Sequence, residues 1–508
     1  MNLLLETAIQ FVSIQVMLGI IVGVIMGIIG GALPGISPSM TIALLLPVSL
    51  YLPTPVAISL LMGAYQGAMF GGSITAILIN TPGTASAAAT TIDGYQMALK
   101  GQSGKALKMA LYASCTGGII GTIILLAMAK PLSTVALKFG PPEYFGLMLL
   151  SLALIAGISG KSLLKGLASA CIGLLLAMVG MDPIYGTRRF TFKNINLADG
   201  IQTLSIFIGV FALSEILNQL SQGRKALYKK ADPLAIVDNQ LSFKEYWGQR
   251  GNMLKSSIIG ALIGVLPGIG GSTACFVAYA EAQRQSKHPE KFGTGILDGI
   301  AAPESANNAV CGGALVPLLT LGIPGDVVTA ILVGALITHG IKPGPLLFIE
   351  DMGSVYTIYI ALLLSVIVLF FVGRLGNPMF AKIVKLRKAT LLPMIFVICV
   401  VGAYSNRGNV FDVIMMLLFG IMGFVMNKNK FPVPPLVIAF VIGSQLETSL
   451  RQSLILSDNS VAIFFTRPIS LALMVISIVF CAFMVRRNKK AADKVSIVIN
   501  DAGEEEEE

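Results

Sequence analysis

The chain has 508 residues, of which 55% are hydrophobic and only 12% are charged, and its formal net charge is +10. Soluble domains average about 25% charged residues, so this composition excludes a soluble protein of this length. It predicts instead an all-α polytopic membrane protein, for which we expect no nucleic-acid partner.

Apolar stretches that approach the length needed to span a hydrocarbon core recur along the whole chain. They lie at residues 12–29, 109–129, 144–158, 163–179, 201–217, 354–372, 391–403, 410–425, 435–442 and 469–485. Together with the interrupted segments described next, they predict roughly ten to twelve crossings. No positive charge precedes the first stretch, which therefore resembles a first transmembrane helix more than a removed signal peptide.

Two interrupted segments of the N-terminal half return in the C-terminal half. Leu-Pro-Gly-Ile-Ser-Pro-Ser at residues 33–39 returns as Leu-Pro-Gly-Ile-Gly-Gly-Ser at residues 266–272. A Gly-Gly doublet then precedes a Pro-Gly break at residues 80–84, and another doublet precedes the break at residues 322–326. Motifs repeated in the same order indicate an internal duplication. We predict a first repeat over residues 1–220, a second repeat core over 253–350 and further transmembrane helices over 351–488.

Basic residues are absent before Lys100 and then gather in a connector at residues 221–252, at 382–388 and at 486–490. By the positive-inside rule these clusters and the C-terminus are cytoplasmic, and the N-terminus is periplasmic. The repeats then enter the membrane from opposite sides, which is an inverted topology. Trp247 in the connector is compatible with an interfacial helix or with a solvated loop. The acidic tail at residues 489–508 is predicted to be disordered.

Backbone that leaves the helix inside a membrane persists only where protein or a polar cavity surrounds it. The four breaks therefore predict a shared cavity, in which freed amides at helix N-termini bind a carboxylate and freed carbonyls bind a cation. The alternative for each break is a kink in a packed helix. The predicted substrate-binding residues are Pro34, Gly35, Ser37, Ser39, Asn80, Thr81, Pro82, Gly83, Thr84, Pro267, Gly268, Gly270, Gly271, Ser272, Asn307, Asn308, Pro324 and Gly325.

The most polar stretch near the breaks contains Glu304, Asn307 and Asn308. Pro303 suits the first position of a helix, which would place these three residues within one turn. Asp326 follows the last Pro-Gly break, where an acid is costly unless it is paired or ion-bound. We predict that Glu304, Asn307, Asn308 and Asp326 contribute to cation coupling. Helix capping is the alternative for Asp326, and compensation of a helix dipole at the membrane surface is the alternative for Glu304.

The other reactive residue types indicate no enzyme, cofactor or metal site. The six cysteines lie in or beside apolar segments without CxxC spacing, and they are expected to pack as small apolar residues. A phosphate-binding loop, an HExxH helix and a GxSxG turn are absent from the sequence. For Asp93 and Asp298, capping or surface exposure is the expected role.

The repeated motifs resemble those of the large membrane subunit of the tripartite tricarboxylate transporter family. The resemblance rests on residues 33–36, 80–84, 266–269, 303–308 and 321–325, and it covers roughly residues 10–485. It implies a bacterial inner-membrane permease that works with a small membrane subunit and a periplasmic solute-binding protein. It also implies secondary import of citrate or related carboxylates, coupled to Na⁺ or H⁺.

The breaks and the resemblance together predict a secondary active transporter with alternating access of the elevator type. In this hypothesis both repeats contribute to one binding site, and Na⁺ or H⁺ is the coupling ion. The alternative is an anion channel or a membrane scaffold subunit without coupled transport. Saturable, ion-dependent uptake would distinguish a carrier from either alternative.

Overall fold

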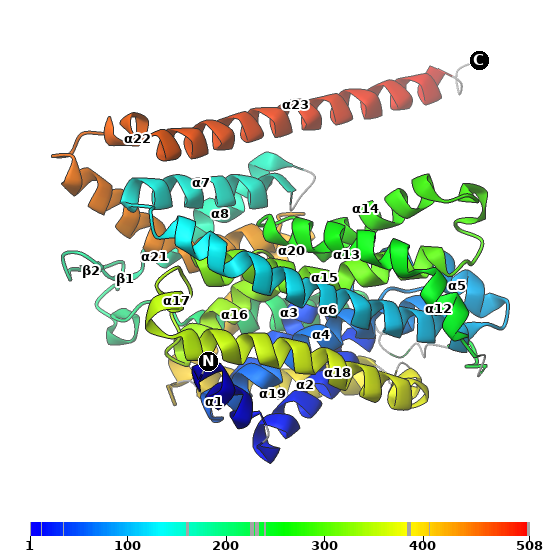
Figure 1. Cartoon of the computed structure of the whole chain (residues 1–508). Helices are drawn as coiled ribbons and strands as arrows, with labels where there is room; N and C mark the ends of the chain where they lie inside the picture. The colour runs from blue at the N-terminus through cyan, green and yellow to red at the C-terminus, as the bar shows by residue number, and fades with distance from the viewer. Residues whose placement is uncertain are drawn as a thin grey trace. The chain divides into compact units, whose positions relative to one another are not determined.

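The computed structural model describes residues 2–11, 13–33, 35–158, 162–223, 228, 233–237, 240–383, 388–405 and 407–504 (Figure 1). Helices account for nearly all of the regular structure in these ranges. The exception is an antiparallel hairpin of β1 (Gly180–Met181) and β2 (Arg188–Arg189), in which Gly180 pairs with Arg189. This confirms the predicted all-α membrane class.

The described residues form two compact units, which are considered separately. One unit contains residues 1–137 and 202–425, and the other contains residues 138–201 and 426–508. The predicted first repeat, 1–220, is thus divided between the units. Pairing between similarly apolar helices depends on where small residues permit close approach, which sequence order does not reveal.

The larger unit begins with the elements of the first repeat. They are α1 (Asn2–Gln10), α2 (Ile14–Ala32), α3 (Pro38–Ser49), α4 (Thr54–Ile79), η1 (Ala85–Ala87), α5 (Ala88–Leu99) and α6 (Ser103–Ala136). After the insertion that belongs to the other unit, the chain continues with α9 (Thr203–Phe207), the π-helix η3 (Ile208–Leu213) and α10 (Ser214–Ser221).

The second repeat has the same order of elements. The connector before it contains α12 (Phe243–Gly248). The repeat itself contains α13 (Arg250–Val265), α14 (Gly270–Gln285), η4 (Pro289–Lys291), α15 (Asp298–Leu321), α16 (Val327–Thr338), α17 (Leu347–Glu350) and α18 (Met352–Ile383). The helices α19 (Lys388–Ser405) and α20 (Val410–Lys428) follow. The helix breaks of the sequence thus separate α2 from α3, α4 from α5, α13 from α14 and α15 from α16.

The smaller unit contains α7 (Pro141–Ile158), α8 (Leu163–Ala177), the hairpin, η2 (Ile195–Leu197), α21 (Val433–Leu456), α22 (Ile463–Thr466) and α23 (Pro468–Glu504). In this unit α8 packs on α21 and α7 packs on α23. A Cβ atom on Gly173 of α8 would stand 2.1 Å from the carbonyl oxygen of Leu436 of α21, so the backbones of the two helices touch.

The last helix, α23, continues to Glu504, which differs from the disordered tail expected for residues 489–508. Residues 489–494 read Lys-Lys-Ala-Ala-Asp-Lys, and Lys and Ala are good helix formers that can extend an existing helix. Residues 505–508 lie outside the described ranges.

Eight helices of the described chain are long and apolar enough to cross a membrane, and four shorter apolar helices accompany them. These numbers are compatible with the predicted ten to twelve crossings, because the helices on either side of a break each cover only part of the bilayer.

The core of the larger unit repeats one packing arrangement. Helix α2 packs on α4 as α13 packs on α15, and the repeats are joined by α6 against α15 and α18 against α4. Small residues permit these contacts. A Cβ atom on Gly31 of α2 would lie 2.2 Å from the carbonyl oxygen of Ala68 of α4, and one on Gly260 of α13 would lie 2.3 Å from that of Ala306 of α15. The internal duplication is therefore visible in the packing.

Candidate functional site

The first break has the same backbone form in both repeats. Leu33 ends α2 with φ −91° and ψ 113°, and Leu266 ends α13 with φ −86° and ψ 114°. Gly35 and Gly268 follow with φ of +95° and +84°, in the region that residues with a Cβ atom avoid. The Pro-Gly sequence thus stops each helix and turns the chain. Pro34 lies outside the described residues.

The second break is also duplicated. Asn80 ends α4 with φ +54°, and Gly322 ends α15 with φ +72°, so a left-handed residue stops both helices. The glycine after each break then lies against α2 in the first repeat and against α13 in the second. A Cβ atom on Gly83 would lie 2.0 Å from the carbonyl oxygen of Gly31, and one on Gly325 would lie 2.6 Å from that of Gly264.

Glu304 is fully buried in α15, where hydroxyl groups of the first repeat surround its carboxyl group. Ser73 Oγ of α4 donates to Glu304 Oε1 at 2.5 Å, Thr90 of α5 donates to the same oxygen, and Ser114 Oγ of α6 donates to Oε2 at 2.9 Å. Helix α15 begins at Asp298, so Pro303 lies inside the helix and not at its first position. Interior prolines are tolerated in membrane helices where neighbours satisfy the freed backbone groups. Glu304 is therefore a buried residue and not part of a helix start at the membrane surface.

The carboxamides of Asn307 and Asn308 join α15 to α4. Asn307 Nδ2 donates to the carbonyl oxygen of Met69 at 2.9 Å, and Asn308 Nδ2 donates to Gln66 Oε1 at 2.7 Å. All three amide side chains are fully buried. Within the described part of the chain, Asn307 Oδ1, Asn308 Oδ1 and Gln66 Nε2 have no hydrogen-bond partner. Buried polar atoms without partners are rare in folded proteins, so these three atoms are candidates to contact an ion, a water or a ligand.

Asp326 has two roles in the structure. It is the N-cap of α16, where its carboxyl group accepts from Thr329 N at 2.7 Å in a capping box, which is the alternative considered for it from the sequence. Its second oxygen, Oδ2, accepts from the hydroxyl of the buried Tyr65 of α4 at 2.8 Å. Thr84, the equivalent residue of the first repeat, caps the start of η1 and contacts Ser86 Oγ at 3.1 Å.

The four helix N-termini expected to offer amides differ in their caps. Ser37 accepts from Met40 N at the start of α3, Thr84 from Ala87 N at η1, and Asp326 from Thr329 N at α16. The start of α14 is different, because its N-cap residue Ile269 makes no side-chain cap hydrogen bond. The first-turn amides of a helix have no partner within the helix. The α14 N-terminus is therefore the best placed of the four to receive an anion.

The α14 N-terminus lies beside the amide cluster of the helix crossing. A Cβ atom built on Gly271 would be 3.1 Å from Met69 Cε, 3.5 Å from Ser86 Cβ and 3.6 Å from Asn307 Oδ1. Helix α14 accordingly packs on both η1 and α15. Residues from the breaks of both repeats meet at this point, together with a buried carboxamide oxygen that has no described partner.

The remaining predicted site residues are spread over the larger unit, and two of them, Gly270 and Ser272, lie in the first turn of α14 itself. Gly35 is beside α10, where its carbonyl oxygen accepts from Gln219 Nε2 at 3.2 Å. Ser37 and Ser39 are hydrogen-bonded to each other, with 2.8 Å between their hydroxyl oxygens. Asn80 and Thr81 are exposed at the end of α4. Of the remaining residues, Pro82, Pro267, Gly268, Gly270 and Ser272 are half-buried, whereas Gly83, Thr84, Pro324 and Gly325 are buried.

Sequence reasoning missed the first-repeat partners of these polar groups. They are Tyr65, Gln66, Ser73, Thr90 and Ser114. Gln66 could have been found, because it precedes the Gly71-Gly72 doublet by the same spacing as Asn307 precedes Gly312-Gly313. The hydroxyl residues carry no such signal, since Ser and Thr are common in membrane helices.

Asp93 is buried and not at the surface as its polar surroundings suggested. Its carboxylate accepts from Tyr279 Oη at 2.8 Å and from the backbone N–H groups of Gly293 at 3.0 Å and Gly295 at 2.7 Å. Asp93 thus joins α5 of the first repeat to the segment that connects α14 with α15. A single carboxylate that satisfies several loop amides is a structural anchor.

Comparisons with known proteins identify the family. Residues 17–438 match the model of the tripartite tricarboxylate transporter TctA family. An Agrobacterium vitis protein, named as an uncharacterized 52.8 kDa protein in the TAR-I ttuC' 3' region, is 40% identical over 438 residues, which are 86% of this chain and 87% of the relative. A second A. vitis protein, from the TAR-II ttuC' 3' region, is 38% identical over 220 residues, which are 43% of this chain and 91% of the relative. No solved structure matches.

The family match covers both repeats, all four helix breaks and the polar crossing of α4 with α15. The helices are those of a multi-pass membrane protein. The chain therefore belongs to the tripartite tricarboxylate transporter TctA family and is a membrane subunit of such a transporter.

Proposed function

We propose that this chain is the large permease subunit of a secondary active transporter that imports citrate-like tricarboxylates or related carboxylates across the bacterial inner membrane. The substrate is delivered by a periplasmic solute-binding protein, a small membrane subunit completes the permease, and a Na⁺ or H⁺ gradient supplies the energy. The N-terminus is periplasmic and the C-terminus cytoplasmic, in accordance with the basic clusters.

The observation that carries the proposal is the meeting of the uncapped α14 N-terminus with Asn307 Oδ1 and Ser86. Free amides and the positive end of a helix dipole attract a carboxylate without a basic side chain. The carboxamide oxygens of Asn307 and Asn308 are hard ligands of the kind that Na⁺ prefers. A cation bound there would offset the charge of the carboxylate, which couples the two ligands.

Glu304 and Asp326 offer the route for H⁺ coupling. Both carboxyl groups are buried. Glu304 accepts from three hydroxyl groups of the first repeat, whereas Asp326 accepts from Tyr65 of the first repeat and from Thr329 of its own helix. A carboxyl group in such a place is neutral or charged according to what else is bound nearby. The proposed movement is elevator-like, in which the re-entrant elements carry the site across the membrane.

Uptake by proteoliposomes tests the function. The purified permease with its small membrane subunit is reconstituted, and labelled citrate uptake is measured with and without a Na⁺ gradient, a proton gradient and the binding protein. We expect saturable uptake that requires one gradient and increases with the binding protein. Uptake that is linear in citrate and indifferent to both gradients would support the channel alternative instead.

Two glycines in equivalent helical positions provide a matched variant and control for the substrate site. Gly271 lies in the first turn of α14 beside Asn307, whereas Gly251 lies in the first turn of α13 with open space around it. We expect Gly271→Val to abolish uptake and Gly251→Val to leave it nearly unchanged, with both proteins equally well folded. Equal uptake by the two variants would contradict the proposed site.

Substitutions of Asn307 test whether its carboxamide oxygen binds the cation. Asn307→Ala removes Oδ1, and we expect the Na⁺ concentration for half-maximal uptake to rise about tenfold, which corresponds to about 1.4 kcal/mol. Asn307→Asp retains an oxygen and should restore much of the Na⁺ affinity. Asn252→Ala in α13 is the control. An unchanged Na⁺ dependence in Asn307→Ala would exclude this residue from the cation site, and proton-driven uptake would then direct attention to Glu304 and Asp326.

A further inference from the structure

Helix α14 packs along η1 and α5, beginning at the proposed substrate site. On each side of this contact the facing residues are three or four positions apart, as are residues on one face of a helix. They are Ser86, Ala89 and Asp93 on one side and Gly271, Cys275 and Tyr279 on the other. This contact, named the α5–α14 seam, joins the first repeat to the second within the larger unit.

The first two layers of the seam consist of small residues. At the site, a Cβ atom built on Gly271 would lie 3.5 Å from Ser86 Cβ. About one turn further along, Ala89 and Cys275 are fully buried in an apolar cluster that also contains Phe292. Such small side chains bury little apolar area, so they contribute little to the free energy that holds the helices together. The seam therefore depends on its third layer.

Asp93 forms the third layer and fastens it by several hydrogen bonds. Its fully buried carboxylate accepts from Tyr279 Oη at 2.8 Å and from the backbone N–H groups of Gly293 at 3.0 Å and Gly295 at 2.7 Å. A Cβ atom on Gly299 of α15 would lie 2.0 Å from Asp93 Oδ2, so α15 also packs against this carboxylate. Loss of the carboxylate would leave all of these donors without their acceptor.

A cavity of about 410 Å³ lies at the end of the seam away from the proposed substrate site. It is bounded by the end of α5, the start of α6, α12 and residues 295–298. Met97, one turn after Asp93 on α5, lines it. Lys105 of α6 and Glu245 of α12 form an ion pair in its wall. The cavity borders the connector, which the basic clusters assign to the cytoplasm. The seam therefore separates the proposed substrate site from a cytoplasmic cavity.

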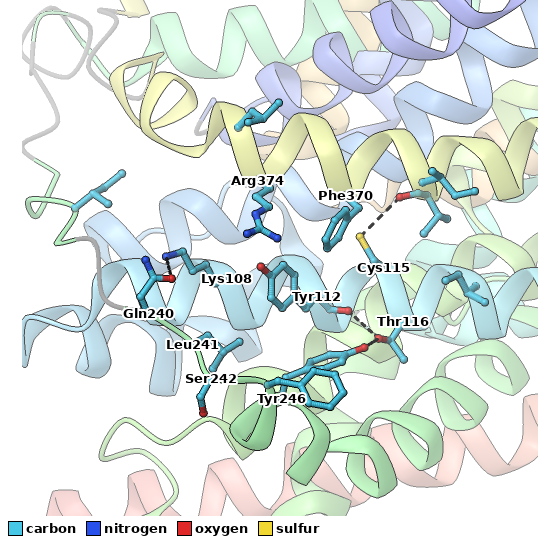
Figure 2. Close-up of a pocket in the computed structure, with 16 residues that line it drawn as sticks. Lys108, Tyr112, Cys115, Thr116, Gln240, Leu241, Ser242, Tyr246, Phe370 and Arg374 are labelled. Atoms are coloured by element: carbon cyan, nitrogen blue, oxygen red, sulfur yellow. Dashed lines mark hydrogen bonds between the residues drawn. The ribbon is translucent and has the colours of Figure 1, made fainter.

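The connector helix α12 is tied to both repeats beside this cavity. Figure 2 shows the hydroxyl group of Tyr246 beside that of Thr116 of α6, and 2.8 Å separates the two oxygens. Gln249, directly after α12, donates from Nε2 to Oδ2 of Asp298 at the start of α15, at 2.9 Å. The connector thus holds the ends of α6 and α15 that form the wall of the cavity.

We propose that the α5–α14 seam is the cytoplasmic gate of the permease, with Asp93 as its latch. The gate is closed in this structure, and it opens when α5 and α14 part, which breaks the hydrogen bonds to Asp93 and exposes Cys275. A carboxylate at the α14 N-terminus then enters the cavity, while α12 holds α6 and α15 together at its wall. The gate rests on the proposed transport function, whereas the latch does not.

Thiol labelling of the full-length protein tests the latch, with the native Cys275 as the reporter. The purified protein in detergent is treated with N-ethylmaleimide, and the modification of each cysteine is followed over time by peptide mass spectrometry. We expect Asp93→Ala to raise the rate at Cys275 about tenfold, because local opening no longer breaks hydrogen bonds. Tyr279→Phe keeps the ring and removes one donor, so it should raise the rate less. Cys399, fully buried in α19, is the internal reference.

Asp351→Ala is the matched control, because Asp351 also accepts a backbone N–H, from Ser354, but lies directly before α18. It should leave the rate at Cys275 unchanged. An unchanged rate at Cys275 in Asp93→Ala would overturn the latch. So would equal increases at Cys275 and Cys399, since these would indicate loosening of the whole protein. If Asp93→Ala does not fold, the rate in Tyr279→Phe decides in the same way.

Cross-linking tests whether the seam opens during transport. Ala89→Cys places a second thiol in the apolar cluster of Cys275, and a short, reducible bifunctional thiol reagent joins the two. We expect citrate uptake by proteoliposomes to stop on cross-linking and to return on reduction, whereas the unaltered protein treated with the same reagent continues to transport. Undiminished uptake by the cross-linked protein would overturn the gate. Absence of uptake from every sample would refute the transport function and the gate with it, while the latch measured by labelling would stand.

Discussion

The two repeats share a backbone frame but differ in their polar side chains. Both have helices that stop at equivalent positions, and in both a glycine after the second break packs against the helix that precedes the first break, α2 or α13. The second repeat then supplies the acids and carboxamides, Glu304, Asn307, Asn308 and Asp326. The first repeat supplies most of their partners, including Tyr65, Ser73 and Thr90.

This difference indicates how a duplicated fold forms a single polar centre. Because donors and acceptors lie on opposite repeats, neither repeat alone satisfies its buried polar groups. The spacing of the glycines preserves the backbone arrangement common to both repeats, since a side chain at any of these glycines would collide with the backbone of a neighbouring helix. The positions facing the other repeat differ between the two halves, and together they form one asymmetric polar centre.

The shared frame is tested first, with the largest expected effect. Gly83→Ala and Gly325→Ala each place a methyl group against a backbone carbonyl oxygen, at 2.0 Å and 2.6 Å. We expect each to destabilise the protein by about 3 kcal/mol, the upper end for overpacking, with Gly83→Ala the more severe. Thermal unfolding of the purified protein in detergent measures this. Gly251→Ala, with nothing near its Cβ, is the control; stability equal to that control would mean that the frame is not packed as described.

The asymmetric centre is tested by Glu304→Ala. The substitution leaves the hydroxyl groups of Ser73, Thr90 and Ser114 buried without their acceptor and also creates a cavity. We expect a loss of about 2–3 kcal/mol in stability, because each stranded polar group costs free energy. Ser73→Ala removes only one donor and should cost about 1 kcal/mol. If the two variants were equally stable, the carboxyl group would not organise the three hydroxyls.

The backbone arrangement shared by the repeats could be predicted from the sequence, whereas the polar centre around Glu304 and Asp326 could be predicted only in part. Pro and Gly act on the backbone at their own positions, so 33–39, 80–84, 266–272 and 322–326 are recognisable without tertiary structure. The partners of Glu304 come from three helices that are distant in sequence, and only folding brings them together. Gln219 beside Gly35 and the anchoring role of Asp93 were unpredictable for the same reason. The cap differences among the four N-termini depend on side-chain rotamers, which the sequence does not specify.

The Tyr65–Asp326 hydrogen bond distinguishes the repeats at the second break. Tyr65→Phe removes the hydroxyl and leaves the capping interaction of Asp326 with Thr329 intact. We expect a loss of about 1–2 kcal/mol, typical of one buried hydrogen bond. Tyr95→Phe in α5 is the control, because Tyr95 makes no hydrogen bond with described residues. Thr84→Ala should be no worse, since the described hydrogen bonds of the Thr84 hydroxyl group stay within η1, to Ser86 Oγ and from Ala87 N. A much larger loss in Thr84→Ala would reverse the proposed asymmetry.

The smallest expected effect lies outside the repeats, in the smaller unit. Asp182 follows β1 and accepts hydrogen bonds from Tyr185 N, Ile184 N and Arg451, with distances of 2.9, 2.8 and 2.7 Å. The pKa of Asp182 is lowered from 3.8 to about 2, chiefly by the hydrogen bond from the Tyr185 backbone N–H and then by those from Ile184 N and Arg451. The buried carboxyl groups of the repeats lie among hydroxyl groups, whereas the Asp182 carboxylate lies in the loop after β1 and is stabilised by backbone amides and by Arg451 of α21.

A lowered pKa fixes the direction of the pH dependence. The stabilisation is complete above the ordinary pKa of 3.8 and is lost as the pH falls toward about 2, because protonation then removes the charge that the amides and Arg451 bind. Hydrogen exchange of the amides in residues 182–187, corrected for intrinsic rates, should show protection that declines over this interval. Asp182→Asn should reduce that protection at neutral pH and remove its pH dependence, whereas Asp199→Asn in the following loop should do neither. Protection that stayed constant down to about pH 2 in the unaltered protein would show that the turn is held by its backbone alone. The charge of Asp182 would then not stabilise the turn, and this carboxylate would no longer differ from the buried carboxyl groups of the repeats in its electrostatic role.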